Sequence, residues 1–310
     1  MKKVFIDGSV GTTGLRIYER LSQREDVSLI TLSEENRKNP SARKQAINSA
    51  DVVFLCLPDD AAREAVSMVE NENVTIIDAS TAHRTLPNWA YGFPELAPVF
   101  EQKVLSSKRI AVPGCHASGF IALVYPLVEA GILSKDALLS CHSITGYSGG
   151  GKKMIAEYEN EQRNALLDAP RQYALTQGHK HLKEMQAIGG LENAPVFSPI
   201  VSDFYSGMVV TVPLFAKMLQ KGKTAADIKA VYAQKYQGEI VKYVENADEN
   251  GFLSGKALCG KDSMRIAVAG NEDRILLLAA YDNLGKGASG AAVECMNMVI
   301  GAQKTKGLIL

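Results

Sequence analysis

Apolar positions in the first part of the chain alternate between short runs and sets with helical spacing. The short runs are rich in β-branched side chains and predict strands at residues 3–6, 28–32, 52–57, 74–77 and 110–112. Apolar side chains three and four residues apart predict helices over 10–21 and 62–69. Strand, helix and strand in this order are typical of a mostly parallel sheet. The run 52–57 is apolar at nearly every position, as a central strand requires.

The pattern changes after Gly114, where longer strand-like runs predominate. They lie at residues 138–147, 196–201, 208–214, 240–244, 264–269 and 274–281. Helical spacing predicts helices over 117–128, 152–167 and 225–236, and a closing helix over 288–299. Strands grouped in this way favour an α+β domain with a mixed or antiparallel sheet. Residues 166–178 have weak periodicity, which predicts a long loop near a functional surface.

Composition narrows the function classes. A chain of 310 residues accommodates two domains, and its 46% apolar and 22% charged content is that of a globular protein rather than a disordered one. Lys plus Arg equals Asp plus Glu at 34 each, so no global positive charge favours nucleic acid or an anionic membrane. No apolar stretch suits a membrane span, and Asp7 interrupts the first apolar run too early for a signal peptide. Five cysteines without CxxC spacing indicate free thiols, so we expect a cytoplasmic enzyme or binding protein.

A glycine-rich turn joins the first predicted strand to the first predicted helix. Its spacing is GxxGxxG rather than GxGxxG, and it consists of Gly8, Ser9, Val10, Gly11, Thr12, Thr13 and Gly14. Glycines allow the backbone to approach a pyrophosphate, and the start of the helix supplies free N–H groups. Such a turn can also be purely structural. The strand–helix–strand context favours dinucleotide binding.

The loop after the second strand bears on the choice of cofactor. Ser33 occupies the position where a carboxylate would bind the ribose of NAD, and Arg37 and Lys38 could bind the 2′-phosphate of NADP. Glu34 and Glu35 oppose such a phosphate. The pattern favours NADP over NAD; the alternative is a solvated, charged loop.

Cys115 stands out from the other cysteines by its position. It follows the strand-ending Pro113 and Gly114 and lies in the first turn of a predicted helix, where a thiol pKa is lowered. This predicts a thiolate nucleophile suited to an acyl carbonyl. The alternative is a small buried side chain, which is the expectation for Cys56, Cys141, Cys259 and Cys295.

Five histidines are candidates for acid–base work. His179 and His181 lie where the long loop meets a helical pattern, a suitable place for a group directed into a cleft. We expect His142 to be a core residue and His116 to point away from the adjacent thiol. A metal site with Cys115 is not expected, because further ligands with suitable spacing are missing and residues two apart do not share a helix face.

Two polar segments are candidate anion sites. Arg84 follows the fourth strand, at the edge where doubly wound sheets bind ligands, and could bind a phosphate or carboxylate. A surface salt bridge is the alternative for this arginine. The glycine-rich residues 146–152 precede a helix and form a second possible anion nest.

Taken together, these motifs are similar to those of a known family. The chain resembles the N-acetyl-γ-glutamyl-phosphate reductases, specifically the short (type 2) subfamily, over nearly its whole length. The matching segments are 8–14, 78–84, 91–95, 112–115, 146–149, 179–184 and 282–287. The last three are the most specific of these.

The resemblance implies a semialdehyde dehydrogenase-like fold and a reaction in arginine biosynthesis. A Rossmann-type NADP-binding domain would comprise 1–114 and 285–310, and an α+β catalytic and dimerisation domain would comprise 115–284. Cys115 would displace phosphate from N-acetyl-γ-glutamyl phosphate, and hydride from NADPH would reduce the thioester to the semialdehyde. His179 would be the acid–base residue, with His181 the weaker claimant. We expect a homo-oligomer, either a dimer or a tetramer.

Further site residues are implied by the same resemblance. Substrate contacts would come from Arg84, Lys152, His181 and Glu184, with Ser148 a candidate as well. Cofactor contacts would come from the glycine turn and from Ser33, Arg37, Pro58, Ser148, Gly149 and Asn283. This chain has His83 where the long form commonly has an aromatic residue, and Lys183 where proline is common.

Three other functions remain open at this point. An aspartate-semialdehyde dehydrogenase-like enzyme would share fold and mechanism but act on another acyl phosphate. A non-catalytic NADP-binding regulator would bind the cofactor and be indifferent to replacement of Cys115. A reductase without a covalent step would keep most of its activity in a Cys115→Ser variant.

Overall fold

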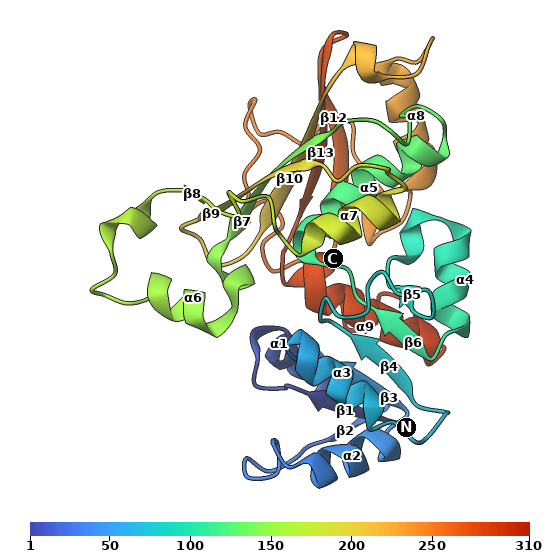
Figure 1. Ribbon diagram of the computed structural model, residues 1–310, viewed down its shortest axis with the longest axis vertical. Coiled ribbons are helices and arrows are strands. Elements are labelled where there is room, and N and C mark those ends of the chain that lie inside the picture. The colour runs from blue at the N-terminus through green and yellow to red at the C-terminus, as the bar shows by residue number, and fades with distance from the viewer. The chain divides into compact units, whose positions relative to one another are not determined.

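The computed structural model describes residues 1–310, which fold as two compact units (Figure 1). The first unit comprises Met1–Gly114 and Ala288–Ile309, and the second comprises Cys115–Gly287 with Leu310. The boundary therefore falls directly before Cys115. The last helix of the chain belongs to the first unit, although nearly 175 residues separate the two segments of that unit, roughly one domain's length.

The first unit contains a six-stranded sheet in which every neighbouring pair is parallel. The strand order is β2-β1-β3-β4-β6-β5, with β1 (Lys2–Asp7), β2 (Val27–Ile30), β3 (Val52–Leu55), β4 (Thr75–Asp78), β5 (Ala90–Tyr91) and β6 (Arg109–Ala111). β3 and β4 are buried at every position, as central strands covered on both faces must be. The direction of strand order reverses between β1 and β3, which is where doubly wound sheets bind ligands.

Helices cover both faces of this sheet. Alternate side chains of β1 and β3 belong to two separate hydrophobic clusters, as the two-residue period of a strand requires. One cluster includes side chains from α1 (Thr12–Leu21), α4 (Pro98–Ser106) and α9 (Gly290–Val299). The other includes side chains from α2 (Pro40–Ser49) and α3 (Asp59–Ser67). A parallel sheet between two helical layers is the expected Rossmann-type arrangement.

The second unit is built on a seven-stranded mixed sheet. Its order is β11-β12-β13-β10-β7-β9-β8, with β7 (Ser140–Gly146), β8 (Arg171–Gln172), β9 (Val196–Ser202), β10 (Met208–Phe215), β11 (Val241–Tyr243), β12 (Met264–Gly270) and β13 (Arg274–Tyr281). β12, β13, β10 and β7 are antiparallel neighbours, whereas β7–β9 and β11–β12 are parallel pairs. The predicted fold class, a parallel-sheet domain with an α+β domain, is confirmed.

One face of this second sheet carries helices. α5 (Cys115–Glu129) packs on β10 and β13, and α7 (His181–Gly189) and α8 (Ala225–Lys235) pack against α5 (Figure 1). α6 (Gly151–Tyr158) follows β7 after a 3-10 turn, η2 (Tyr147–Gly150). No helix of the protein is both long and apolar enough to cross a membrane.

Several elements differ from the sequence-based expectation. The helix predicted over 152–167 ends at Tyr158, because the side chains of Asn160 and Asn164 accept hydrogen bonds from nearby backbone amides and favour turns. A 3-10 turn, η3 (Ala165–Asp168), follows. α2 and α4 were not predicted; α2 begins at Pro40 with Asn39 as its cap and has weak apolar periodicity. The remaining short elements are η1 (Pro94–Leu96), η4 (Ala216–Met218) and a π-turn, η5 (Gly285–Ser289).

Candidate active site and nucleotide pocket

The turn between β1 and α1 depends on glycine. Gly8 has φ +87°, and its carbonyl oxygen accepts a hydrogen bond from the amide of Gly11 at 3.0 Å. A Cβ atom at Gly14 would lie only 2.3 Å from the carbonyl oxygen of Gly8, so only glycine permits this approach of strand and helix. The first turn of α1, which contains Thr12 and Thr13, has neither an acidic residue nor a side-chain cap. Its amides are therefore suited to an anion.

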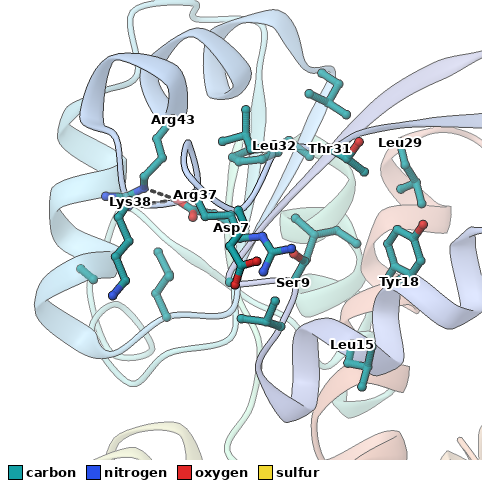
Figure 2. A pocket seen from close by; sticks show the side chains of 18 residues that line it. Asp7, Ser9, Leu15, Tyr18, Leu29, Thr31, Leu32, Arg37, Lys38 and Arg43 are labelled. Atoms are coloured by element: carbon teal, nitrogen blue, oxygen red, sulfur yellow. Dashed lines mark hydrogen bonds and ion pairs between the residues drawn. The ribbon is translucent and has the colours of Figure 1, made fainter.

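A pocket of about 670 Å³ lies beside this turn (Figure 2). Its wall is formed by the end of β1 and the glycine turn, by the end of β2 and the loop that follows, and by α1. The lining residues include Gly8, Ser9, Val10, Leu15, Tyr18 and Thr31. Arg37 and Lys38 line it and are exposed, together with Glu34. Ser33 is not a lining residue, and its hydroxyl accepts a hydrogen bond from Nδ2 of Asn36 at 3.0 Å.

A buried ion pair lies at the base of the same pocket. Two nitrogens of Arg43 donate to one carboxylate oxygen of Asp7 at 3.1 and 3.0 Å (Figure 2). A third nitrogen of Arg43 donates to Glu64 at 2.9 Å. Burial raises the pKa of Asp7, while the hydrogen bonds from Arg43 oppose that rise. Sequence reasoning missed this pair, although an aspartate at the end of an apolar strand was a usable signal.

Arg84 lies at the carboxyl edge of the first sheet, but its side chain donates hydrogen bonds to backbone carbonyl groups. Its Nε donates to the carbonyl of Val112 at 2.8 Å, and its Nη2 donates to that of Ala79 at 3.1 Å. The guanidinium therefore connects the loop after β4 to the segment that leads into Cys115. Pro58, another predicted contact, is an exposed residue at the N-terminus of α3.

Cys115 is the first residue of α5 and is partly buried. The hydroxyl of Tyr281, from the end of β13, donates to the carbonyl of Cys115 and accepts from the amide of Gly119 at 3.0 Å. In a regular α-helix these two backbone groups would bond to each other. A Cβ atom at Gly119 would lie 2.7 Å from the Tyr281 hydroxyl, so this arrangement needs glycine. In the first turn of α5, two hydrogen bonds of the Tyr281 hydroxyl thus replace one backbone hydrogen bond.

Three histidine rings gather at the start of α5. The ring of His116 lies 5.8 Å from that of His179 and 5.6 Å from that of His181, centroid to centroid, and the latter two are 4.7 Å apart. The amide of His181 donates to Nδ1 of His179 at 3.1 Å, which places the proton of the neutral His179 ring on Nε2. Burial, with a contribution from Lys180, lowers the pKa of His179 to about 4. His179 is therefore neutral at pH 7.

Tyr173 completes this cluster and was not predicted from the sequence. Its hydroxyl is 2.7 Å from Nε2 of His116, whose Nδ1 is 2.6 Å from the hydroxyl of Ser143. Burial, with a smaller contribution from His179, lowers the pKa of His116 to about 3. Burial and the negative charge of Cys115 raise the pKa of Tyr173. His116 thus belongs to a buried polar cluster with Ser143, Tyr173 and the two histidines of the α7 region.

The remaining predicted residues lie in η2, on α6, on α7 and directly after β13. Ser148 accepts a hydrogen bond at 3.0 Å from Asn283, whose Oδ1 accepts from the amide of Gly207 at 2.9 Å; Gly149 follows Ser148 in η2. Lys152 is exposed on α6. Glu184 is buried on α7, three residues after His181 and therefore on the same helix face.

Comparison with known proteins agrees with this geometry. Residues 115–283 match the family model "Semialdehyde dehydrogenase, dimerisation domain", and residues 3–101 match "Semialdehyde dehydrogenase, NAD binding domain". A protein from Nostoc sp. named N-acetyl-gamma-glutamyl-phosphate reductase 2 is 43% identical, with 99% of each chain covered. The chain belongs to the N-acetyl-γ-glutamyl-phosphate reductase family. The Brucella ovis member is 45% identical over 96% of this chain and 99% of its own.

Solved structures place the family's fold among semialdehyde dehydrogenases. Aspartate semialdehyde dehydrogenase II from Vibrio cholerae superposes with a TM-score of 0.72 at 17% identity, covering 97% of this chain and 98% of its own. The enzyme from Francisella tularensis gives a TM-score of 0.72 at 15% identity, with coverages of 97% and 100%. At such identity the likeness concerns the fold alone. The predicted family and reductase class are confirmed by the closer sequence relatives.

Two expectations about single residues are wrong. His142 is exposed rather than in the core, because β7 alternates and its neighbour Ser143 takes the buried face. Cys259 is exposed in a turn beside Gly260, with its sulfur 3.1 Å from the hydroxyl of Ser206. Cys141 and Cys295 are buried as expected, and Cys56 is partly buried.

Proposed function

We propose that this protein reduces N-acetyl-γ-glutamyl phosphate to N-acetyl-glutamate semialdehyde and phosphate, in arginine biosynthesis, with NADPH as the reductant. The observation that carries the proposal is Cys115 at the first turn of α5, beside a cluster of neutral imidazole and phenol groups. Relatives with 43% and 45% identity bear the corresponding name. We assign cofactor binding to the first unit and the covalent chemistry to the second.

The first step would be acyl transfer to sulfur. The start of a helix favours an anion, so Cys115 would react as the thiolate. The sulfur attacks the acyl carbon, the bond between that carbon and the phosphate oxygen breaks, and phosphate leaves. A thioester on Cys115 results.

The second step would be reduction of the thioester. Bound NADPH would supply a hydride to the thioester carbon. His179, with its proton on Nε2, can donate a hydrogen bond to the oxyanion that develops there. Collapse of the resulting thiohemiacetal breaks the carbon–sulfur bond, releases the aldehyde and restores the thiolate. His181 remains the alternative for the proton-transfer role, because it is buried in the same cluster.

The pocket of Figure 2 fits the adenosine end of a dinucleotide. Gly8 and Gly14 leave room for a pyrophosphate at the start of α1, and the cationic Arg37 and Lys38 suit a ribose 2′-phosphate. Titrations with NADPH and NADH test this assignment. Replacing Arg37 and Lys38 with alanine should weaken NADPH binding about 10-fold or more and leave NADH binding nearly unchanged. Equal losses for both cofactors would argue against a phosphate contact.

Substrate contacts follow from charge and exposure. Lys152 is exposed at the start of α6 and is a suitable partner for the leaving phosphate. Glu184 is buried on the same face of α7 as His181 and would orient that ring or the amide of the substrate. Arg84 would act mainly by positioning the backbone before Cys115, since two of its nitrogens donate to carbonyl groups.

We also propose that the second unit forms a homodimer through the sheet face opposite α5. Ile144, Phe215 and Leu276 are exposed by 41%, 55% and 39%, and strand pairing places their side chains on that face. Leu276→Glu should lower the molecular mass measured by light scattering, whereas Leu105→Glu, at an exposed apolar position in the first unit, should not. An unchanged mass for Leu276→Glu would argue against this face. We place the enzyme in the cytoplasm, where Cys115 would stay reduced.

The activity is tested by comparing two acyl phosphates. We expect NADPH oxidation with N-acetyl-γ-glutamyl phosphate and little with β-aspartyl phosphate, and a complete loss in Cys115→Ser. Preference for aspartyl phosphate would favour the aspartate-semialdehyde alternative. Full activity of Cys115→Ser would favour a reductase without a covalent step, and cofactor binding without turnover would favour a regulator.

A further inference from the structure

The turn that follows β13 lies directly against the nucleophile. β13 ends at Tyr281, and the chain then turns through residues 282–287 into η5. A Cβ atom at Gly287 would lie 3.1 Å from the Cβ of Cys115 and 3.3 Å from its Cα, which is closer than ordinary van der Waals contact. Because the Cβ atom of Cys115 carries the sulfur, the contact with Gly287 limits where the sulfur can lie.

The residue before this turn holds the main chain of the nucleophile. The hydroxyl of Tyr281 donates to the carbonyl of Cys115 and accepts from the amide of Gly119. Tyr281 is fully buried, so these two hydrogen bonds are made away from solvent. Cys115 is therefore contacted at its carbonyl by Tyr281 and at its Cβ atom by Gly287, the two ends of one short segment.

Asp282 sets the shape of this segment. The side chain is fully buried, and its Oδ1 accepts hydrogen bonds from the amides of Leu284 at 2.7 Å and Gly285 at 3.1 Å. The main-chain carbonyl of Asp282 accepts from the amides of Gly285 and Gly287, each at 3.1 Å. Asp282 therefore bonds directly to Gly287, the residue that touches the Cβ atom of Cys115.

The other carboxylate oxygen of Asp282 anchors the turn to the loops that precede β10 and β12. It accepts from the hydroxyl of Ser206 at 2.7 Å and from the amide of Gly260 at 2.5 Å. The turn also runs close to the backbone of the second loop, since a Cβ atom at Gly285 would lie 2.0 Å from the carbonyl oxygen of Lys261. The position of the turn is thus fixed from within and from its neighbours.

This arrangement requires a carboxylate at position 282. Each of its two oxygens accepts from two donors, and a carboxylate is the side chain that accepts at both oxygens and donates at neither. An asparagine has the same shape but would direct its NH₂ group at two of the four donors, whichever way its amide is turned. Asp282→Asn therefore disturbs the turn without changing its volume.

We infer that Asp282 is a positioning residue for the nucleophile: it folds the segment 281–287 so that Tyr281 holds the carbonyl of Cys115 and Gly287 holds its Cβ atom. The inference rests on the proposed role of Cys115 as the nucleophile. The start of a helix stabilises an anion only within its first turn, so a small displacement of the sulfur from the amides of α5 disfavours the thiolate. Asp282 does not touch the reacting atoms and acts through the other two residues.

The test measures the alkylation rate of Cys115 by iodoacetamide between pH 5 and pH 10, without substrate or cofactor. Peptide mass spectrometry separates Cys115 from the exposed Cys259. Asp282→Asn and Tyr281→Phe should each slow alkylation about 5- to 10-fold at pH 7 and move the profile to higher pH. Because both act on one segment, the double variant should be slowed by much less than the product of the two effects.

Two further phenols on the same helix provide matched controls. Tyr232 and Tyr236 are buried and donate to the carbonyl groups of Leu123 and Ala122, in the middle of α5. Tyr232→Phe and Tyr236→Phe remove the same kind of hydrogen bond as Tyr281→Phe but leave the start of the helix intact. We expect a normal alkylation profile in both, even where the variant is less stable.

Two results would overturn the inference. One is a normal alkylation profile in Asp282→Asn, and the other is an equal effect of Tyr281→Phe and Tyr232→Phe. Should Asp282→Asn fail to fold, Gly287→Ala carries the test, since it adds one methyl group against Cys115 and should slow alkylation about 3-fold; a normal rate there would contradict the contact. Alkylation needs no turnover, so a failure of the proposed reaction would be seen separately in the acyl-phosphate assay.

Discussion

Replacing His116 with glutamine should flatten the acid dependence of the protein's stability. Burial lowers the pKa of His116 to about 3, whereas a histidine in an unfolded chain titrates near 6.5. The unfolded chain therefore takes up the proton first, and stability is lost as the pH falls below about 6.5. Glutamine does not take up a proton in this pH range, so the His116→Gln variant should not show this part of the loss of stability.

The size of the effect follows from the two pKa values. At pH 5 the unfolded ring is almost fully protonated while the folded ring is still neutral. With values of about 3 and about 6.5, linkage gives a loss of about 2 kcal/mol between pH 7 and pH 5. That is a substantial share of the 5–15 kcal/mol, roughly, that stabilises a typical domain. His179 contributes in the same direction but is present in both proteins, so their difference reports on His116 alone.

Urea unfolding at pH 7 and pH 5 measures this difference. Circular dichroism follows the whole chain, and the fluorescence of Trp89, the single tryptophan, follows the first unit, which does not contain His116. The pH effect should therefore appear in the unfolding of the second unit, which circular dichroism detects and Trp89 fluorescence does not. The glutamine variant is expected to be less stable at pH 7, because its ring is lost, yet to lose about 2 kcal/mol less on acidification. Equal losses in both proteins would refute a neutral, buried His116.

Two substitutions of glycine test the close contacts of the site. Gly14→Ala would place a Cβ atom 2.3 Å from the Gly8 carbonyl oxygen, so it should cost about 1–3 kcal/mol and weaken dinucleotide binding; unchanged melting and NADPH titration would contradict the turn geometry. Gly119→Ala would place one 2.7 Å from the Tyr281 hydroxyl. The higher helix propensity of alanine adds at most about 1 kcal/mol of stability, so the steric cost of overpacking should outweigh it. We expect lower stability and slower alkylation of Cys115. A more stable Gly119→Ala with normal alkylation would show that the Tyr281 contact is dispensable.

Features set by local chemistry could be predicted from the sequence. The β1–α1 turn follows an apolar strand and carries glycines at the positions where backbone meets backbone, so its place in the fold could be predicted. The place of Cys115 in the first turn of a helix could be predicted because Pro113 and Gly114 end one element and helical spacing begins the next. These signals lie within a few residues of each other.

Features set by distant partners could not be predicted. Tyr173 lies in a segment without periodicity, and the ring that defines its role, His116, is 57 residues away. His142 looked like a core residue because its neighbours are apolar, but a strand turns alternate side chains to opposite faces of its sheet. The predicted helix after Lys152 was cut short by side-chain hydrogen bonds of two asparagines, which apolar spacing does not record.

Acylation of Cys115 is the claim on which the proposed chemistry depends, and it can be observed directly. The protein is incubated with N-acetyl-γ-glutamyl phosphate in the absence of reduced cofactor, quenched in acid and digested for mass spectrometry. An N-acetyl-glutamyl thioester on the peptide that begins α5, released when NADPH is added, is the expected result. An adduct on another side chain, or no adduct in a protein that turns over, would contradict the mechanism.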